Sequence, residues 1–191
     1  MKGMLKGVAA LALASALFTT SAQAQTSMQF GIGGGATLPL GDFADAASSL
    51  GFHGLVNAEF QPANLPVGFR IEGMFNRIGF NDDLTVDGNY QIISGTANVV
   101  YTFMTAEESK FHPYLIGGVG MYNFKANVDD ADNDSETKFG FNAGAGFNVA
   151  MGGAAVFIEG RFHQIMLGDD NGGNVNMIPI SIGVRFGGSG N

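Results

Sequence analysis

The sequence predicts an all-β protein that forms a closed, eight-stranded, antiparallel up-and-down transmembrane β-barrel. The clearest observation is the stretch 176–186, NMIPISIGVRF, in which apolar residues alternate with Pro179, Ser181, Gly183 and Arg185. This two-residue period is typical of a strand with one apolar face. A face that contains an arginine is unfavourable in an ordinary apolar core. A transmembrane strand can instead direct its apolar face to lipid and its polar face to the barrel interior.

The same alternation recurs along the chain, and this is the second observation. Eight segments show it, separated by stretches rich in Gly, Pro, Asn and Asp that indicate turns. The segment 39–51 is predicted to be one such loop. The expected strands are Met28–Leu38, Phe52–Phe60, Val67–Ile78, Asn89–Phe103, Phe111–Lys125, Lys138–Met151, Ala155–Met166 and Asn176–Phe186.

The third observation is the abundance of glycine, 30 residues, many of them inside the apolar segments. Glycine weakens a strand in the interior of a soluble sheet. In a narrow barrel it leaves room for long lumen side chains, or for aromatic rings that lean across from a neighbouring strand. The glycines therefore favour a barrel whose interior is filled by side chains.

The facing of one strand, 111–125, is ambiguous because both of its parities are apolar. Tyr114 and Tyr122 lie on one parity, whereas Leu115 and Met121 lie on the other. We predict that the aromatic parity faces lipid. Aromatic side chains are then expected to form two girdles at the membrane interfaces. The girdle residues are predicted to be Phe60, Phe69, Phe103, Tyr114 and Phe186 at one end, and Phe52, Phe80, Tyr90, Phe124 and Phe139 at the other.

The N-terminal segment has the pattern of a secretory signal peptide. Lys2 and Lys6 precede an apolar run, Val8–Phe18, and a small-residue A-x-A site follows at Ala22–Ala24. We therefore predict a signal peptide over 1–24, and one barrel domain over 25–191 with a short tail, 187–191, after the last strand. The apolar run is shorter than the roughly 20 residues that a transmembrane helix needs. The chain contains no cysteine, which excludes a disulfide framework.

The charge of the chain argues against nucleic acid as a partner. The formal net charge is −8, and it becomes more negative once Lys2 and Lys6 are removed. Binding to phosphate backbones needs a basic surface instead. Most of the acidic residues fall in the connections expected to face outward. These are Asp42, Asp45, Asp82, Asp83, Asp87, Asp129, Asp130, Asp132, Asp134, Glu136, Asp169 and Asp170.

Six charged residues lie on the inward parity of the predicted strands. They are Glu59, Arg70, Glu72, Glu159, Arg161 and Arg185. Three positive and three negative charges can neutralise one another in an interior where an unpaired charge costs several kcal/mol. Because the interior of an eight-stranded barrel is filled by its own side chains, we expect this charge network to be a structural plug. A gated or proton-conducting path remains the alternative.

Four stretches together resemble a known family. These are the closing strand, GATLPLGDFADA (35–46), HPYLIGGVG (112–120) and FIEGRFH (157–163). They resemble the bacterial outer-membrane β-barrel domain family, the small barrels related to OmpA and OmpX, over essentially the whole mature chain. The resemblance implies a monomer without a cofactor in the outer membrane of a diderm bacterium. It also implies a structural or interaction role, in membrane integrity or in adhesion through the acidic loops. The barrel assembly machinery would read the last strand, which ends on Phe186.

Three cations map near the outer ends of strands: Arg77, Lys125 and Lys138. Besides outer-membrane lipids in general, we expect lipopolysaccharide phosphates to contact them, since a cation on a flexible stem suits an interface. The alternative is that they are rim residues that keep the loops soluble.

No metal site is predicted. Asp130, Asp132, Asp134 and Glu136 recur every second residue, like the start of a calcium loop. Ser135 and Phe141, however, occupy the positions where an EF-hand needs glycine and glutamate. Weak divalent-cation binding by these four residues therefore stays open beside a solvated acidic loop.

Two further alternatives concern function. His53 and His163 lie inward near the outer mouth, but no serine has a local catalytic signature, so no catalytic residue is predicted and a lipid-modifying enzyme is disfavoured. The second alternative is a soluble periplasmic, lipocalin-like barrel that binds an apolar ligand. In that barrel Phe141, Phe147, Ile180 and Ile182 would line the cavity, and Arg70, Glu72 and Arg161 would face water.

Overall fold

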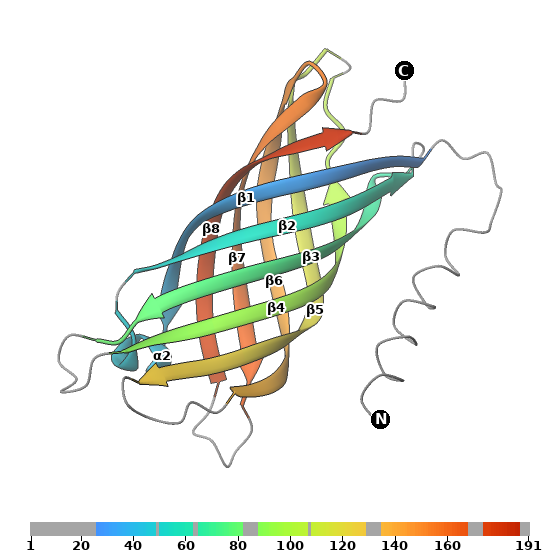
Figure 1. Ribbon diagram of the computed structural model, residues 1–191. Coiled ribbons are helices and arrows are strands. Elements are labelled where there is room, and N and C mark those ends of the chain that lie inside the picture. Colours follow the sequence, from blue (N-terminus) through green and yellow to red (C-terminus); the bar gives the residue numbers. More distant parts are fainter. Residues whose placement is uncertain are drawn as a thin grey trace, which may run out of the picture.

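The computed structural model describes residues 26–48, 50–62, 65–81, 88–106, 108–128, 135–167 and 174–187. It confirms the predicted fold class, a closed eight-stranded antiparallel barrel (Figure 1). The elements are β1 (Thr26–Leu40), α2 (Asp42–Ala46), β2 (Gly51–Pro62), β3 (Val67–Gly79), β4 (Gly88–Thr102), β5 (Phe111–Val128), β6 (Ser135–Met151), β7 (Ala154–Met166) and β8 (Asn174–Gly187). The predicted signal peptide lies outside the described residues and stays a prediction.

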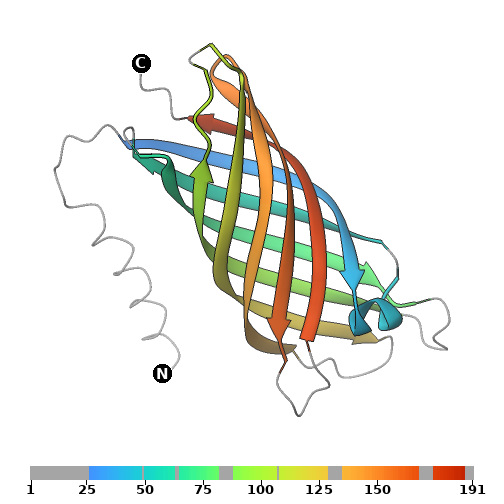
Figure 2. The same cartoon turned by 180° about the vertical axis from the view of Figure 1, so that it is seen from behind.

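Each strand pairs with the next one, and the barrel closes where β8 pairs with β1. At this seam Gly33 lies opposite Gly183 and Ala36 lies opposite Ile180. The strands are steeply tilted from the barrel axis in both views (Figures 1 and 2), as closure of a sheet requires. Closure leaves no sheet edge with unpaired backbone groups.

The two ends of the barrel differ. Gly152 and Gly153 join β6 to β7 in a tight turn, in which Gly152 has a φ of 69°, a left-handed conformation that favours glycine. This turn lies at the same end as the last residues of β8, whereas α2 lies at the opposite end (Figure 1). Outer-membrane barrels have short periplasmic turns and longer outward loops. The α2 end is therefore assigned to the cell exterior and is called the outer mouth.

The outer wall of the barrel is apolar. Exposed side chains there include Phe30, Ile32, Val56, Phe69, Ile71, Ile93, Val99, Leu115, Val119 and Ile182. Monomeric soluble proteins rarely expose contiguous apolar surface on this scale. Ile180 and Ile182 are 46% and 57% exposed, whereas Arg70, Glu72 and Arg161 are buried. The lipocalin-like alternative required the reverse facing and is wrong. No helix among the described residues is long and apolar enough to cross a membrane.

The predicted facing of β5 is also wrong. Tyr114, Ile116 and Tyr122 point into the barrel and are buried, while Leu115 and Met121 are exposed on the outer wall. The physical reason is hydrogen bonding, because both tyrosine hydroxyls find partners on β7 inside the lumen. An apolar wall would have left those hydroxyls without partners.

The first outward connection is more ordered than a simple loop. Most of the segment 39–51, predicted to be a loop, is split between the end of β1 and the short helix α2. Asn81 holds α2 in place: its backbone N–H donates to Ala46 O and its side chain donates to Asp45 O, both at 3.2 Å. Phe43 of α2 is consequently buried in the outer mouth.

The predicted girdles are correct only in part. Phe52, Phe139, Phe69, Phe103 and Phe186 are exposed on the outer wall. Phe80, Tyr90, Phe124 and Tyr114 are not girdle residues. The first three pack on one another inside the outer mouth, with centroid distances of 4.7 Å for Phe80 and Tyr90 and 5.4 Å for Tyr90 and Phe124.

Candidate functional site: the filled lumen

The six predicted lumen charges meet in one buried network at mid-barrel. Arg70 on β3 is its centre. Its Nε and Nη2 atoms both lie 2.8 Å from Oε2 of Glu59 on β2. Its Nη1 donates at 2.6 Å to Oε2 of Glu159 on β7, so one guanidinium joins two sides of the barrel. The planar guanidinium can therefore face two carboxylates at once, with Nε hydrogen-bonded to Glu59 and Nη1 hydrogen-bonded to Glu159.

Arg161 and Arg185 complete the network. Arg161 Nε lies 2.8 Å from Oε1 of Glu159, and its Nη2 pairs with Glu72 on β3. Arg185 Nη1 lies 3.1 Å from Oε2 of Glu59. All six side chains are buried, and three cations face three anions. Each charge therefore has a partner that offsets the large cost of removing it from water.

Tyr114 on β5 ties the network to the aromatic part of the lumen. Its hydroxyl donates to Oε2 of Glu159 at 2.7 Å and accepts from Nη2 of Arg185 at 3.3 Å. The guanidinium carbons of Arg70 and Arg185 lie 5.2 and 5.3 Å from the Tyr114 ring centroid. Arg185 also stacks over Phe157, 4.8 Å from its centroid. These distances are in the range of cation–π attraction.

Glycines make room for the large side chains, as predicted from their abundance. Gly146 lies opposite both Tyr114 and Glu159 across its two ladders, and a Cβ there would be 2.6 Å from the Tyr114 hydroxyl. Gly33 and Gly183 underlie the ring of Phe157 in the same way. The tyrosine and phenylalanine rings thus lie across neighbouring strands at places where a side chain would collide with them.

A chain of neutral hydrogen bonds lies beside the charges. Thr37 Oγ1 donates to Asn76 Oδ1 at 2.7 Å, so its oxygen is left to accept from Nδ1 of His53 at 3.0 Å. His53 Nε2 is then the acceptor for Ser181 Oγ at 2.8 Å. The contact between Ser181 and His53 could not be predicted from the sequence, because only the register of the closed barrel brings β8 near His53.

A serine beside a histidine is the arrangement of an activated nucleophile. Here, however, the third group is Thr37 rather than a carboxylate, and Ser181 is only 2% exposed. His163 does not join this chain, because its Nδ1 lies 2.9 Å from the Tyr122 hydroxyl instead. His53 and His163 therefore belong to separate hydrogen-bonded groups. This arrangement is suited to holding the strands in register.

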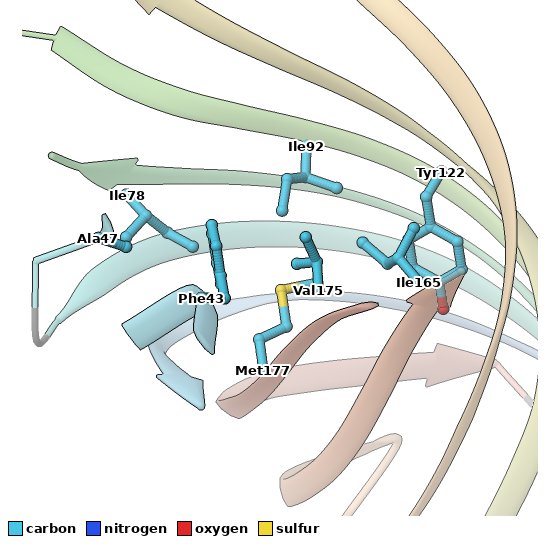
Figure 3. Close-up of a cluster of buried hydrophobic side chains, with 8 residues drawn as sticks. All are labelled: Phe43, Ala47, Ile78, Ile92, Tyr122, Ile165, Val175 and Met177. Carbon is cyan, nitrogen blue, oxygen red and sulfur yellow. The ribbon is translucent and has the colours of Figure 1, made fainter. Parts of the chain in front are cut away.

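An apolar cap closes the lumen above these polar layers. Phe43 of α2 points into the outer mouth, between Ile78 and Val175 (Figure 3). The buried cap residues are Phe43, Ala47, Ile78, Ile92, Tyr122, Ile165, Val175 and Met177. Tyr90 and Phe124 pack edge-on against Phe43, with centroid distances of 5.2 and 6.2 Å. The cap thus draws side chains from most of the strands around one helical residue.

The three cations predicted near the strand ends do not share one face. Arg77 and Lys125 have the outward parity of β3 and β5, and each lies opposite Gln91 of β4. Lys138 lies opposite the inward-facing Tyr122 and forms a 2.9 Å ion pair with Glu136. Only the first two therefore share a membrane-facing surface.

The predicted acidic cluster is only partly described. Asp130, Asp132 and Asp134 lie outside the described residues, and Glu136 is the one member within them. Among the residues that the structure describes, no group of three or more His, Cys, Asp or Glu side chains is placed to hold a metal ion.

An apolar outer wall around a charged, capped interior defines an integral membrane β-barrel with a filled lumen. The chain matches the outer membrane protein beta-barrel domain family over residues 10–186 and belongs to that family. It is an outer-membrane protein. A 22 kDa outer membrane protein of Rhizobium leguminosarum bv. viciae is 25% identical over 166 residues, covering 82% of this chain and 77% of the relative.

Two solved structures show the same fold. Neisserial surface protein A superposes with a TM-score of 0.58 at 20% identity, covering 84% of this chain and 96% of that one. A major outer membrane protein of Thermus thermophilus superposes with a TM-score of 0.59 at 14% identity, covering 84% and 99%. At these identities the likeness concerns the fold alone.

Proposed function

We propose that this outer-membrane protein is a monomeric, closed structural barrel without a continuous aqueous pore, which supports the integrity of the envelope and presents acidic loops to partners outside the cell. The observation that supports the proposal is that side chains fill the lumen at two levels. The buried network around Arg70 crosses the middle of the barrel, and the cap around Phe43 covers its outer mouth. An ion following the axis would have to displace both.

The interaction half of the proposal rests on charge at the outer mouth. Asp42 and Asp45 are exposed on α2, on the outward side of the cap. Most other acidic residues of the chain belong to the outward connections. A cationic partner at the cell surface fits such loops through complementary potentials.

Two further partners are part of the proposal. Lipopolysaccharide phosphates contact the cations at the outer rim of the wall. The barrel assembly machinery reads β8, on which Phe186 is exposed and faces away from the lumen. An enzymatic role has less support. Ser181 and His53 are buried, and the hydrogen-bond partners of His53 are Thr37 and Ser181 rather than a carboxylate.

Planar-bilayer recording tests the closed-barrel proposal. Purified, folded protein is expected to give no steady channels, with a general porin reconstituted alongside as the positive control. Folding of the same sample is checked by heat-dependent gel mobility, so that silence cannot come from unfolded chain. Steady porin-like openings would overturn the proposal.

A further inference from the structure

The outer wall of β1 to β5 contains a shallow apolar depression of about 670 Å³. This wall faces the viewer in Figure 1. Its floor includes Gly73 of β3 and Gly95 of β4, which lie directly opposite each other in the ladder. Val56, Ile71 and Met121 stand around it, each more than half exposed. The size falls within the roughly 300–1,000 Å³ of small-molecule sites.

The depression exists because two outward positions lack side chains. A Cβ at Gly95 would meet nothing within 4 Å, and one at Gly73 would meet only Val56 Cγ2, at 3.8 Å, and Ser94 O, at 4.0 Å. Within the described part of the chain, no other side chain is recorded close to these two positions. Gly73 and Gly95 belong to the β3–β4 ladder, and the hydrocarbon layer holds no water that could fill the space above them, so an apolar chain is the suitable occupant of the floor.

Two cations stand above the depression, toward the outer mouth. Arg77 follows Gly73 by four residues on β3, and Lys125 follows Met121 by four on β5, which is about 13 Å along each strand. Both lie opposite Gln91, so about 10 Å separates their strands. Among the described residues neither has an ion-pair partner. Strands of such barrels tilt by roughly 35–45° from the membrane normal, so most of the distance along the strand is height above the depression. The cations therefore reach the edge of the apolar band.

A second copy of the chain is a poor occupant for this surface. Two barrels inserted in the same direction would meet through a two-fold axis along the membrane normal, with the same patch on both sides. Such a contact would place Arg77 and Lys125 of one barrel against those of the other. Like charges facing each other at an interface disfavour association.

We propose that the depression and the two cations form a binding site for one outer-leaflet lipid, with an acyl chain against Gly73 and Gly95 and a phosphate between Arg77 and Lys125. The proposal deepens the lipopolysaccharide contact proposed above and restricts it to one site. Lys138 is excluded from the site, because it lies on the inward parity and pairs with Glu136. The closed-barrel proposal does not depend on it, since conductance and lipid binding are measured separately.

Native mass spectrometry of the full folded protein in non-ionic detergent tests the site. The probe is diphosphoryl lipid A, titrated to give an apparent Kd for the one-to-one complex. Gly95→Leu places a side chain on the floor at a position where its Cβ would meet nothing within 4 Å, and is expected to weaken binding about tenfold or more. Arg77→Gln combined with Lys125→Gln is expected to do the same, since a charge-assisted contact of this kind corresponds to about a tenfold change. Lipid A without its phosphates should bind the wild-type protein as weakly as this double variant does.

The chain offers matched controls. Gly160 of β7 is also outward and unobstructed, but it is not part of the depression, so Gly160→Leu should leave the Kd unchanged. Lys138→Gln should also leave it unchanged. Heat-dependent gel mobility confirms that each variant is folded. Met121→Ala removes a side chain from the rim of the depression and should weaken lipid binding, which gives a second test of the position of the acyl chain.

Three results would overturn the proposal. The first is wild-type affinity in Gly95→Leu, or an equal loss in Gly160→Leu. The second is displacement of lipid A by inorganic phosphate at comparable concentration, because the acyl chain would then contribute nothing. The third is a dimer that disappears in Gly95→Leu, which would assign the depression to a second copy of the chain.

Discussion

Tyr114 on β5 donates a hydrogen bond of 2.7 Å to Oε2 of Glu159 on β7, reaching over the intervening strand β6 at Gly146. The phenol thus adds a neutral donor to a carboxylate that already faces Arg70 and Arg161. Side chains of β3 and β5 thus meet on one carboxylate of β7, through Arg70, Tyr114 and Glu159. The contact explains why the aromatic side of β5 faces inward.

Tyr114→Phe is expected to lower the free energy of unfolding by about 1–3 kcal/mol, because the charged groups Glu159 and Arg185 both lose a hydrogen-bond partner. Urea titration in detergent micelles, followed by gel mobility, measures the change. Tyr101→Phe is the control, because Tyr101 is exposed on the outer wall. Equal effects of the two variants would contradict the role given to the Tyr114 hydroxyl.

Glu159→Gln should destabilise the barrel much more, by about 3–5 kcal/mol, since it leaves buried guanidiniums short of a counter-charge. The matched control is Glu136→Gln. The Glu136 side chain is 55% exposed and pairs with Lys138 at 2.9 Å, and exposed pairs contribute at most about 1 kcal/mol. Urea titration of both variants gives the comparison, and a loss for Glu159→Gln no larger than the control would refute the network as a stabilising element.

Gly183→Ala is expected to cost about 1–3 kcal/mol through overpacking. A Cβ at Gly183 would collide with the backbone oxygen of Ile32 on β1 and would lie 2.5 Å from two ring carbons of Phe157, whose side chain is buried in the lumen. Gly160→Ala adds the same methyl group where nothing lies within 4 Å, and should change stability by no more than about 0.5 kcal/mol. Thermal unfolding of both variants decides the point. If Gly160→Ala is the more harmful, the packing explanation fails.

Phe43→Ala should cost about 3–5 kcal/mol because it empties the centre of the outer cap. It should nevertheless create no channel, since the ion pairs around Arg70 still cross the lumen below. Phe52→Ala is the comparison, as Phe52 is exposed on the lipid-facing wall. Steady conductance in Phe43→Ala alone would mean that the cap, and not the charge network, is the barrier.

Ser181→Ala should behave as a structural change only. Loss of the hydrogen bond to His53 is expected to cost about 1 kcal/mol. Folded wild-type protein should not react with a fluorophosphonate probe, because Ser181 is buried and His53 has no carboxylate partner. Labelling that disappears in Ser181→Ala would reopen the enzymatic alternative.

The fold could be predicted from the sequence because a transmembrane barrel must alternate apolar and polar residues in every strand. In β7, for example, Ile158 and Phe162 fall on one parity, and Glu159, Arg161 and His163 fall on the other, which assigns both faces. The observed strand bounds differ from the predicted ones by at most three residues, and the larger differences lie mostly where ladders extend into the outward connections.

The facing of β5 could not be predicted in the same way. Leu115 and Val119 are as apolar as Ile116, so parity alone carried no information. What decides the facing is whether Tyr114 has a partner and enough room, and both depend on Gly146 and Glu159 of other strands. The register of the closed sheet brings these neighbours to Tyr114, and this register cannot be predicted from any single segment of the sequence.

The same limit applies to the site. Parity placed all six charges inward, but the particular pairs, such as Arg70 with Glu159, depend on the three-dimensional closure of the barrel. Phe43 gave no signal in the sequence, because its burial depends on Tyr90 and Phe124 from distant strands. The pair of Ser181 and His53 was missed for the same reason.

Arg185 belongs to the last strand, yet it contacts Glu59 on β2 and lies 4.0 Å from Glu159 on β7. Before β8 docks, the growing sheet contains three carboxylates and only two guanidiniums, Arg70 and Arg161, along its future interior. A chain that stalls at this stage is left with an excess anion that it cannot bury. The order of charges along the sequence therefore favours the finished cylinder over a sheet that still lacks its last strand.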